Sequence, residues 1–272
     1  MIDNKVYFMN REARKIQAQE HTKFVEQVYS KEIQDCVSRS ERYTFSANVN
    51  VTPNPSVETE VVLSVMGTTD AIFENSSAPG KICALNFASY RNPGGMFYEG
   101  SSAQEESLCH DSFLYSVLRQ FQDVYYSWNN LNKNKGLYKN RAIYTPGVIF
   151  MGPVKAGDNH IDKQVACDII TCASPNWRAA SEYGKATKDE NTEALTSRIK
   201  FIMDIAAANK VDTLILGAFG CGVFRQDPYE VATIFKNFLY NQYAGVFKKV
   251  VFAIPDTVHG ENLKAFTKVL CG

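Results

Sequence analysis

The sequence predicts an α/β fold in which a mixed, largely parallel sheet is flanked by helices. Short β-rich apolar runs alternate with segments of helical periodicity through the second half of the chain, which is the pattern of strand–helix–strand units. Hydrophobic residues make up 45% of the 272 residues and charged residues 21%, as in folded globular proteins. No internal repeat or change in composition divides the chain, so we expect one domain over residues 1–272.

The first half of the chain contains a helical N-terminal extension, two strands and one long helix. Residues 10–34 carry apolar side chains at helical intervals and predict one amphipathic helix that packs on the body of the protein. Residues 35–60 are rich in turn-forming residues and are expected to be extended. Residues 61–66 and 82–87 are predicted strands. Apolar residues at three- and four-residue spacing predict a single helix over residues 104–121.

The second half alternates between strands and helices. A polar, basic segment over residues 129–141 predicts an exposed loop, and residues 181–191 predict a polar linker. Strands are predicted at residues 142–144, 148–151, 165–171, 213–216 and 250–254, and helices at 194–208 and at the C-terminus. One further helix is expected to begin at Asp227, because Asp at the N-cap, Pro228 at the first position and Glu230 at the third all favour a helix start.

Composition excludes several classes of protein. The 29 Lys and Arg residues balance 29 Asp and Glu residues, which argues against a generic nucleic-acid-binding protein. No apolar run approaches the roughly 20 residues that span a bilayer, and the polar N-terminus predicts no signal peptide. Seven cysteines without a CxxC pair are typical of a reduced intracellular protein, cytoplasmic or, in a eukaryote, nuclear. We expect no metal site, and the lack of an apolar stripe favours a monomer.

One segment with the features of a ligand site follows the predicted strand at 82–87. Gly94 and Gly95 allow close approach of the backbone to a ligand, at the strand end where α/β proteins bind theirs. Adjacent carboxylates, Glu105 and Glu106, then begin a helix. In the purely structural alternative, Ser102 is the N-cap of a capping box with Glu105. That alternative leaves Glu106 unexplained, since it points about 100° away from Glu105 on a helix.

A second glycine-rich segment, residues 217–224, lies between a predicted strand and a helix. Three glycines within six residues free backbone N–H groups that can hold an anion, and the following helix start adds a favourable dipole. The spacing is neither GxGxxG nor a Walker P-loop, so it does not indicate dinucleotide binding. A plain strand-to-helix turn is the alternative. Cys221 has no His nearby in the sequence, and we interpret it as a small packed residue rather than a nucleophile.

These two segments together resemble those of the microbial (bacterial-type) poly(ADP-ribose) glycohydrolases, a branch of the macrodomain superfamily. That family has a triple-glycine loop followed, after a short spacer, by Gln-Glu-Glu. Here Gly94, Gly95 and Met96 precede Gln104, Glu105 and Glu106 by seven residues. Residues 85–89, 92–95, 168–178 and 217–224 also resemble family segments, as do residues 11–29, so the resemblance covers most of the chain. It implies a macrodomain-like core over residues 61–272 and an N-terminal accessory segment over residues 1–60.

The resemblance implies hydrolysis of ribose–ribose O-glycosidic bonds, with poly(ADP-ribose) or an ADP-ribosylated protein as partner and ADP-ribose as product. Glu106 is then the general acid and base, and Glu105 binds the ribose beside the scissile bond. Further residues are implied to bind the ligand. Asn86 and Gln104 orient the ribose, and Gly94 and Gly95 pass close to it. The implied diphosphate loop contains Gly217, Gly220, Cys221, Gly222 and Val223, and Phe224 packs on the distal sugar or base. No cofactor is needed, because the reaction passes through an oxocarbenium-like state that a carboxyl group of raised pKa can assist. We expect burial and Glu105 to raise the pKa of Glu106.

The sequence departs from the family pattern at two positions. Met96 replaces the third glycine, and Glu99 stands where small residues are usual. The Met96 side chain can narrow the cleft, displace the attacking water, or fold away from it. Two alternatives therefore stay open, which are a module that binds ADP-ribose without cleaving it and a hydrolase of another ADP-ribosyl linkage. The residues that contact adenine are not assigned by the sequence.

Overall fold

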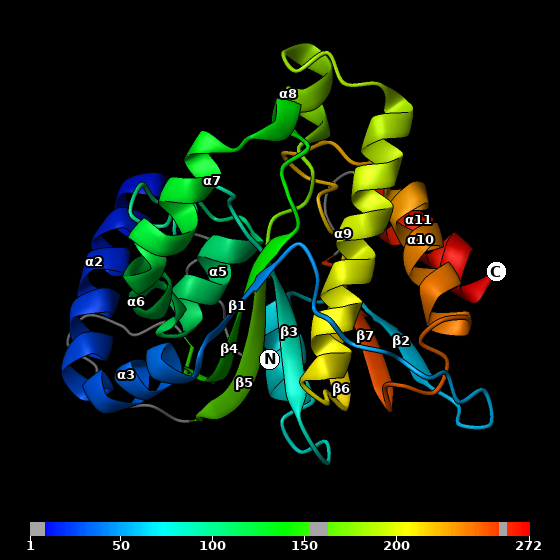
Figure 1. Ribbon diagram of the computed structural model, residues 1–272. Helices are drawn as coiled ribbons and strands as arrows, with labels where there is room; N and C mark the ends of the chain where they lie inside the picture. Colours follow the sequence, from blue (N-terminus) through cyan, green and yellow to red (C-terminus); the bar gives the residue numbers. More distant parts are fainter. Residues whose placement is uncertain (1–8, 153–162, 256–259) are drawn as a thin grey trace.

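A seven-stranded sheet between two layers of helices forms the framework of the protein (Figure 1). The computed structural model describes residues 9–152, 163–255 and 260–272. The strand order is β1-β4-β5-β3-β6-β7-β2. The five strands from β5 to β2 run parallel, while β4 is antiparallel to both β5 and β1. The strands are β1 (Glu41–Thr44), β2 (Glu60–Ser64), β3 (Ile82–Phe87), β4 (Arg141–Phe150), β5 (Val165–Cys172), β6 (Thr213–Leu216) and β7 (Lys249–Ala253). The mixed α/β architecture expected from the sequence is confirmed.

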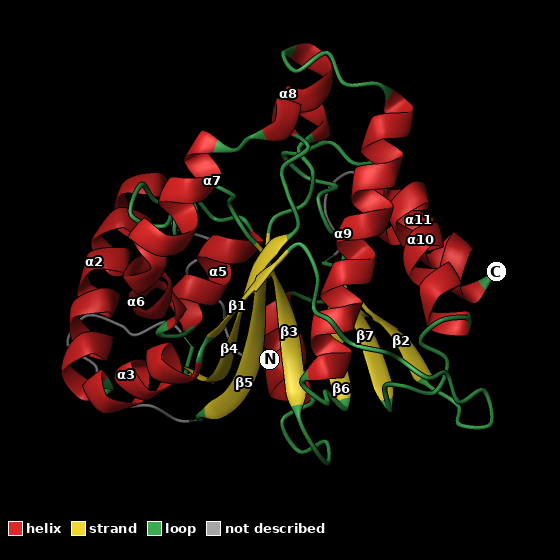
Figure 2. Cartoon of the chain, viewed as in Figure 1, coloured by secondary structure: helices red, strands yellow, loops and turns green. Residues whose placement is uncertain are grey.

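Helices cover both faces of this sheet (Figure 2). One layer contains α2 (Arg11–Val28), α3 (Ser30–Arg39), α4 (Thr68–Glu74), α5 (Gln104–Asp111) and α6 (Leu114–Leu118). The other contains α9 (Lys188–Ala208), α10 (Pro228–Tyr240) and α11 (Glu261–Cys271). Two short helices, α7 (Ser127–Leu131) and α8 (Trp177–Glu182), lie above the carboxyl ends of the strands. Among the described residues, no helix combines the length and apolarity needed to cross a membrane.

Alternating side chains of β3 divide the core into two halves. Ile82 and Ala84 pack in the layer that holds α2 to α6, while Cys83 and Leu85 pack in the layer that holds α9 to α11. This period of two is the ordinary geometry of a strand buried on both faces. The prediction of a strand over residues 82–87 is confirmed, as is that for 213–216.

The prediction of one N-terminal helix is wrong, because the chain breaks at Tyr29 into α2 and α3. Tyr29 has φ −112° and ψ 27°, is 5% exposed, and packs its ring 6.0 Å from that of Phe113. A tertiary contact therefore determines the break. The helix continues to Arg39, so the expected extended segment begins later than residue 35.

The predicted helix over residues 104–121 is also interrupted. Ser112 is extended, with φ −152° and ψ 178°, and separates α5 from α6. Its hydroxyl donates to the Leu108 carbonyl at 2.6 Å and accepts from the Leu114 amide at 3.1 Å, so the side chain competes with the helical backbone pattern. Beyond α6 the chain continues through η1 (Arg119–Phe121) and η2 (Gln122–Tyr126) into α7.

Several boundaries in the second half also differ from expectation. The two strands predicted at 142–144 and 148–151 form one strand, β4, with a bulge between Thr145 and Val148. Part of the loop expected at 129–141 is structured, by the end of α7 and by η3 (Asn134–Gly136). Helix α9 begins at Lys188, inside the predicted linker, because Thr187 and Glu190 form a capping box. The expected start at Asp227 is confirmed, since its carboxylate accepts from the Tyr229 and Glu230 amides.

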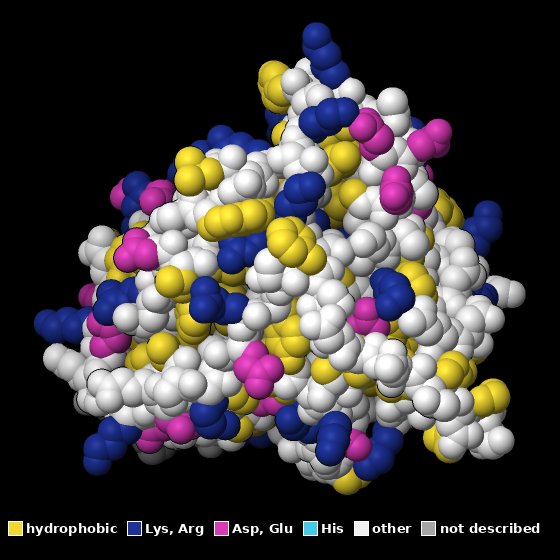
Figure 3. All heavy atoms as spheres, in the orientation of Figure 1, with side chains coloured by type: hydrophobic (Ala, Val, Ile, Leu, Met, Phe, Trp, Pro, Cys, Tyr) yellow, Lys and Arg dark blue, Asp and Glu magenta, His cyan; other side chains and the backbone are white. Residues whose placement is uncertain are grey.

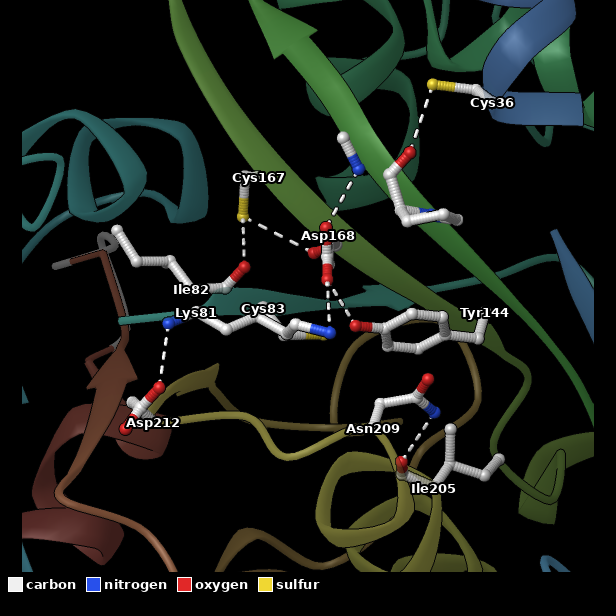
Figure 4. A network of polar contacts seen from close by, with 12 residues as sticks. Cys36, Lys81, Ile82, Cys83, Tyr144, Cys167, Asp168, Ile205, Asn209 and Asp212 are labelled. Carbon is white, nitrogen blue, oxygen red and sulfur yellow. Dashed lines mark hydrogen bonds and ion pairs between the residues drawn. The ribbon is translucent and has the colours of Figure 1, made fainter. Parts of the chain in front are cut away.

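A polar network holds the amino-terminal edge of the sheet (Figure 4). The Asp168 carboxylate accepts hydrogen bonds from the Tyr144 hydroxyl and, at 2.8 Å, from the Gly147 amide. It also lies 3.7 Å from Nζ of Lys81, whose backbone amide donates to Asp212 at 2.8 Å. The Lys81 side chain, just before β3, thus balances the charge of the Asp168 carboxylate in β5. These contacts stabilise the sheet edge opposite the carboxyl ends of the parallel strands.

Candidate active site

The two glycine-rich segments line a single cleft of about 630 Å³ at the carboxyl ends of the parallel strands. This volume is typical of small-ligand sites. The first segment follows β3 and leads into α5, and the second follows β6 and leads into α10. Of the residues singled out in the sequence, the lining includes Gly95, Gln104, Glu105, Glu106, Gly220, Gly222, Val223 and Phe224.

The other four of those residues, Asn86, Gly94, Gly217 and Cys221, are not part of the lining. Asn86 is fully buried behind Glu105. A Cβ at Gly94 would lie 2.7 Å from the Tyr115 ring, and one at Gly217 would lie 2.7 Å from the Ala253 carbonyl oxygen, so both glycines permit close packing. Burial raises the pKa of the Cys221 thiol, which keeps it in the poorly nucleophilic protonated form.

Glu105 is 3% exposed, and the protein holds both of its carboxyl oxygens. Oε2 accepts from the Ser89 amide at 2.6 Å, and Oε1 accepts from the side-chain amide of Asn86 at 3.3 Å. Burial raises the pKa of Glu105 to about 8; the neighbouring Glu106 adds to the rise, while these hydrogen bonds oppose it. The capping-box alternative is wrong, because Ala103 is the N-cap of α5 and makes no side-chain cap.

Glu106 is 6% exposed and lines the cleft beside the glycine loop. Its Oε1 accepts a hydrogen bond from the Met96 amide at 2.8 Å. Burial is the main cause of its raised pKa, as expected, and the acidic neighbour that adds to the rise is Glu99. Glu105 was the neighbour expected from the sequence. Glu106 therefore favours its protonated form more than an exposed glutamate does, as a proton donor requires.

Gly95 lies against the two carboxyl groups. It has φ +62°, and an added Cβ would lie 2.5 Å from Oε1 of Glu106 and 3.0 Å from Oε2 of Glu105. A side chain at this position is therefore incompatible with the observed carboxyl positions. The next residue, Met96, is 47% exposed at the rim of the cleft, and its backbone amide donates to Glu106.

Gln104 begins α5 and connects the helix to the end of β3. Its Oε1 accepts from the Phe87 amide at 2.8 Å, and its Nε2 donates to the Leu85 carbonyl at 2.9 Å. The same nitrogen donates to the Thr68 hydroxyl at 3.1 Å. The side chain thus fixes the position of the helix start relative to the sheet, in addition to lining the cleft.

Helix α2 supports the glycine loop from outside, which the sequence did not reveal. Nε of Arg14 donates to the Gly100 carbonyl at 2.7 Å, and Nε of Arg11 donates to the Glu99 carbonyl at 2.8 Å. A Cβ at Gly100, which has φ +73°, would lie 2.2 Å from the Arg11 carbonyl oxygen. The close approach of this helix therefore depends on a glycine in the loop that carries Met96.

The second segment packs against the connection between β5 and α8. Gly220 has φ +78°, and an added Cβ would lie 2.3 Å from Oγ of Ser174. Ser174 itself lines the cleft. The buried Gln226 joins this segment to the connection between β5 and α8. Its backbone amide donates to the Gly220 carbonyl at 3.0 Å, and its side-chain Nε2 donates to the Pro175 carbonyl at 2.8 Å. Sequence analysis did not assign Ser174 or Gln226 to the site.

Behind this wall lies a buried arginine that the sequence also did not single out. Arg198 of α9 is 1% exposed and donates to the carbonyl of Ala173 and, at 2.7 Å, to Oδ1 of Asn140. No carboxylate of the described residues forms an ion pair with it. Because a buried charge without a counter-ion creates a strong local potential, Arg198 makes this side of the cleft favourable for an anion.

The far end of the cleft is formed after β7 and at the start of α11. Its lining there includes Ala253, Ile254, Pro255 and Asn262. This part of the lining is largely apolar and suits a flat heterocycle. Within the described part of the chain, no group of three His, Cys, Asp or Glu side chains is placed to hold a metal ion.

Comparisons with known proteins agree with this geometry. The family model described as "Microbial-type PARG, catalytic domain" matches residues 4–152. A crystal structure of poly(ADP-ribose) glycohydrolase from Thermomonospora curvata has a TM-score of 0.85 and 28% identity, covering 95% of this chain and 100% of that one. The same enzyme bound to the inhibitor ADP-HPD has a TM-score of 0.82 and 28% identity, covering 95% and 99%. The Deinococcus radiodurans enzyme in complex with ADP-ribose has a TM-score of 0.80 and 31% identity, covering 88% and 96%. No curated protein matches the sequence.

Proposed function

Because this chain belongs to the microbial-type poly(ADP-ribose) glycohydrolase family, we propose that it hydrolyses ribose–ribose O-glycosidic bonds in poly(ADP-ribose) and releases ADP-ribose. The observation that carries the proposal is the convergence of Glu106 with Gly220 and Gly222 on one cleft, although these segments are far apart in the sequence. The Thermomonospora curvata and Deinococcus radiodurans proteins that resemble it are themselves poly(ADP-ribose) glycohydrolases.

Glu106 is the general acid and base of the proposed reaction. Its carboxyl proton passes to the departing ribose oxygen as the glycosidic bond breaks, and the resulting carboxylate then removes a proton from the attacking water. The Met96 hydrogen bond holds Oε1, which fixes the orientation of the carboxyl group. Glu105, whose oxygens are held by Ser89 and Asn86, binds the ribose beside the scissile bond. In this scheme Asn86 acts by positioning Glu105.

The second segment holds the diphosphate. Backbone amides of Gly220, Gly222 and Val223 bind its oxygens. The Cys221 amide, which the sequence also assigned to the diphosphate, donates instead to the Ala218 carbonyl at 3.1 Å. The start of α10 is capped by the Asp227 carboxylate and adds nothing to this binding. The buried charge of Arg198 lies on the same side of the cleft and attracts the anion. Bound diphosphate then raises the pKa of Glu106 further and stabilises the developing sugar cation. Phe224 packs on the distal sugar or base, and the apolar end near Ile254 takes the adenine.

We also assign residues 1–60 to an accessory segment and residues 61–272 to the macrodomain core. The contacts of Arg11 and Arg14 with the glycine loop support a role for the accessory segment in shaping the active site. We also propose that the protein acts as a monomer.

The test of the proposed function is the Glu106→Gln variant with labelled poly(ADP-ribose) as substrate. We expect release of ADP-ribose to fall by about 10²- to 10⁴-fold, because the variant keeps the shape of the side chain and removes the transferable proton. Affinity for ADP-ribose, measured by calorimetry, should change little. Glu20→Gln, at an exposed position of α2, is the matched control. Undiminished release by Glu106→Gln contradicts the proposed mechanism.

A second candidate function is a module that binds ADP-ribose without cleaving it. Met96, in place of the third glycine of the family, favours this alternative. Tight binding of ADP-ribose without turnover, together with turnover gained in Met96→Gly, is the result that supports it. A panel of defined ADP-ribosylated proteins and nucleic acids tests the remaining alternative, a hydrolase of a different ADP-ribosyl linkage. Failure to bind ADP-ribose contradicts all three functions.

A further inference from the structure

Beside the cleft lies a positively charged surface formed by Arg42, Arg91, Lys133 and Lys139, here called the basic surface. All four side chains are exposed, and within the described ranges none forms an ion pair with a carboxylate. Residues 124–152 contain no Asp or Glu. Figure 3 shows Lys and Arg side chains interleaved with hydrophobic ones in the area between α7, α8 and β1, while acidic side chains lie around it. The local charge is thus positive although the whole chain is neutral.

Backbone contacts connect the segments that carry Arg42, Lys133 and Lys139. The Tyr138 amide, next to Lys139, donates to the Lys133 carbonyl at 3.2 Å. The Phe45 amide donates to the Asn140 carbonyl at 2.7 Å, which places the end of β1, the strand of Arg42, beside Lys139. The basic surface therefore combines three separate parts of the chain.

Aromatic rings lie within the basic surface. Phe45 is 58% exposed, and its ring meets that of Trp128 edge to face at 6.3 Å. The guanidinium group of Arg141, itself buried, lies 4.3 Å from the Trp128 ring. Cations that follow a phosphate backbone, together with exposed rings on which bases stack, are the features by which proteins bind single-stranded nucleotide chains.

The basic surface begins at the catalytic end of the cleft. Arg91 lies between Ser89 and Asn92, which both line the cleft, and the Ser89 amide binds Glu105. Two hydrogen bonds join Arg91 to Asn130 of α7. Nε of Arg91 donates to Oδ1 of Asn130 at 2.9 Å, and Nδ2 of Asn130 donates to the Arg91 carbonyl at 3.1 Å. Arg91 therefore lies next to the residues that hold Glu105, on the side of the cleft that carries the carboxyl groups.

We propose that the basic surface binds the ADP-ribose units of the polymer that precede the terminal unit. This inference rests on the proposed function, in which the terminal unit fills the cleft from the carboxyl groups toward Phe224. The remainder of the chain then leaves from the catalytic end, where the surface starts. Each further unit carries a diphosphate, for which the lysines and arginines are complementary, and an adenine, which stacks on Phe45 or Trp128.

The test compares two double variants that change the net charge equally. Lys133→Glu/Lys139→Glu alters the basic surface, and Lys23→Glu/Lys31→Glu alters exposed positions of α2 and α3. Both are made in the Glu106→Gln background so that polymer is bound without being consumed. Dissociation constants are measured for long poly(ADP-ribose) and for ADP-ribose at several salt concentrations.

We expect Lys133→Glu/Lys139→Glu to weaken polymer binding by about tenfold or more at low salt and to lower its salt slope by about one unit for each lost contact. Affinity for ADP-ribose and the control variant should change by less than about twofold, as expected for an electrostatic effect confined to this surface. Equal polymer affinity in the two double variants overturns the inference and leaves the proposed function intact. Loss of ADP-ribose binding in the parent protein instead contradicts the proposed function. Equal competition by a single-stranded RNA of the same length shows a general polyanion surface and also overturns the inference.

Discussion

The backbone amide of Met96 donates a 2.8 Å hydrogen bond to Oε1 of Glu106. This contact shows how a chain that lacks the third glycine of its family can still orient the carboxyl group. The interaction uses the main chain, which every residue except proline provides. The Met96 side chain lies half exposed at the rim of the cleft and does not replace any group that holds Glu106.

Met96→Gly should therefore change turnover of poly(ADP-ribose) by less than about threefold, since the amide that positions Glu106 is retained. Steady-state release of ADP-ribose checks this. A large gain in turnover would instead show that the methionine side chain obstructs the reaction, as the binding-module alternative requires.

Gly95→Ala, one residue earlier, should instead lower turnover strongly. The added Cβ would lie 2.5 Å from Oε1 of Glu106 at a residue with φ +62°, so the carboxyl groups must move. We expect turnover to fall by about 100-fold or more, because a displacement of about 1 Å is enough for such a loss. The melting temperature of the variant establishes that it is folded. Wild-type turnover in a folded Gly95→Ala protein contradicts the described geometry.

The variants Gly220→Ala and Gly222→Ala compare a closely packed glycine with an unpacked glycine of the same loop. A Cβ at Gly220 would lie 2.3 Å from Oγ of Ser174, whereas a Cβ at Gly222 meets no atom within 4 Å. Gly220→Ala should weaken ADP-ribose binding by about tenfold or more through movement of the loop. Gly222→Ala should leave the melting temperature unchanged within error. Calorimetry and thermal unfolding measure the two effects, and equal stability and affinity in both variants would refute the packing argument.

Stability should depend on pH through Asp111, which is 2% exposed at the end of α5. Burial raises the pKa of this carboxyl to about 7, above its ordinary value of 3.8. Between these two values the folded state binds more protons than the unfolded state, so this contribution to the free energy of unfolding falls as pH rises. Asp111→Asn should therefore raise the melting temperature at pH 8 and have a smaller effect at pH 4. Asp123→Asn, at an exposed position, controls for the substitution itself. A gain that does not depend on pH contradicts the assignment.

Arg198→Met should destabilise the protein and weaken ADP-ribose binding. The substitution leaves the carbonyl of Ala173 and Oδ1 of Asn140 without their donor, and each unsatisfied buried acceptor costs about 1–3 kcal/mol. Since Ala173 precedes Ser174 of the cleft wall, the binding site should also shift. Lys200→Met, two residues along the same helix at a partly exposed ion pair, should cost less than about 1 kcal/mol. Urea unfolding and calorimetry give the two quantities. Equal costs at both positions would contradict the role assigned to Arg198.

Local patterns in the sequence were sufficient wherever the immediate neighbours of a residue determine its conformation. The strands at residues 82–87 and 213–216 and the helix start at Asp227 are examples, since apolar character and capping chemistry act over a few residues. The breaks at Tyr29 and Ser112 could not be predicted this way. Helical periodicity continues through both breaks. Long-range contacts accompany them, which are the packing of Tyr29 on Phe113 and the backbone contacts of Ser112 with Phe150 and with the His21 ring.

The sequence by itself determined which residues carry chemistry, because two glycine-rich loops and the adjacent pair Glu105 and Glu106 are local features. Only the tertiary structure decided which of those residues line the cleft and which support it. Neighbouring parallel strands β3 and β6 bring the two loops to the same edge of the sheet. Burial, which depends on the whole fold, then raises the pKa of both carboxyl groups and places Arg198 behind the cleft wall.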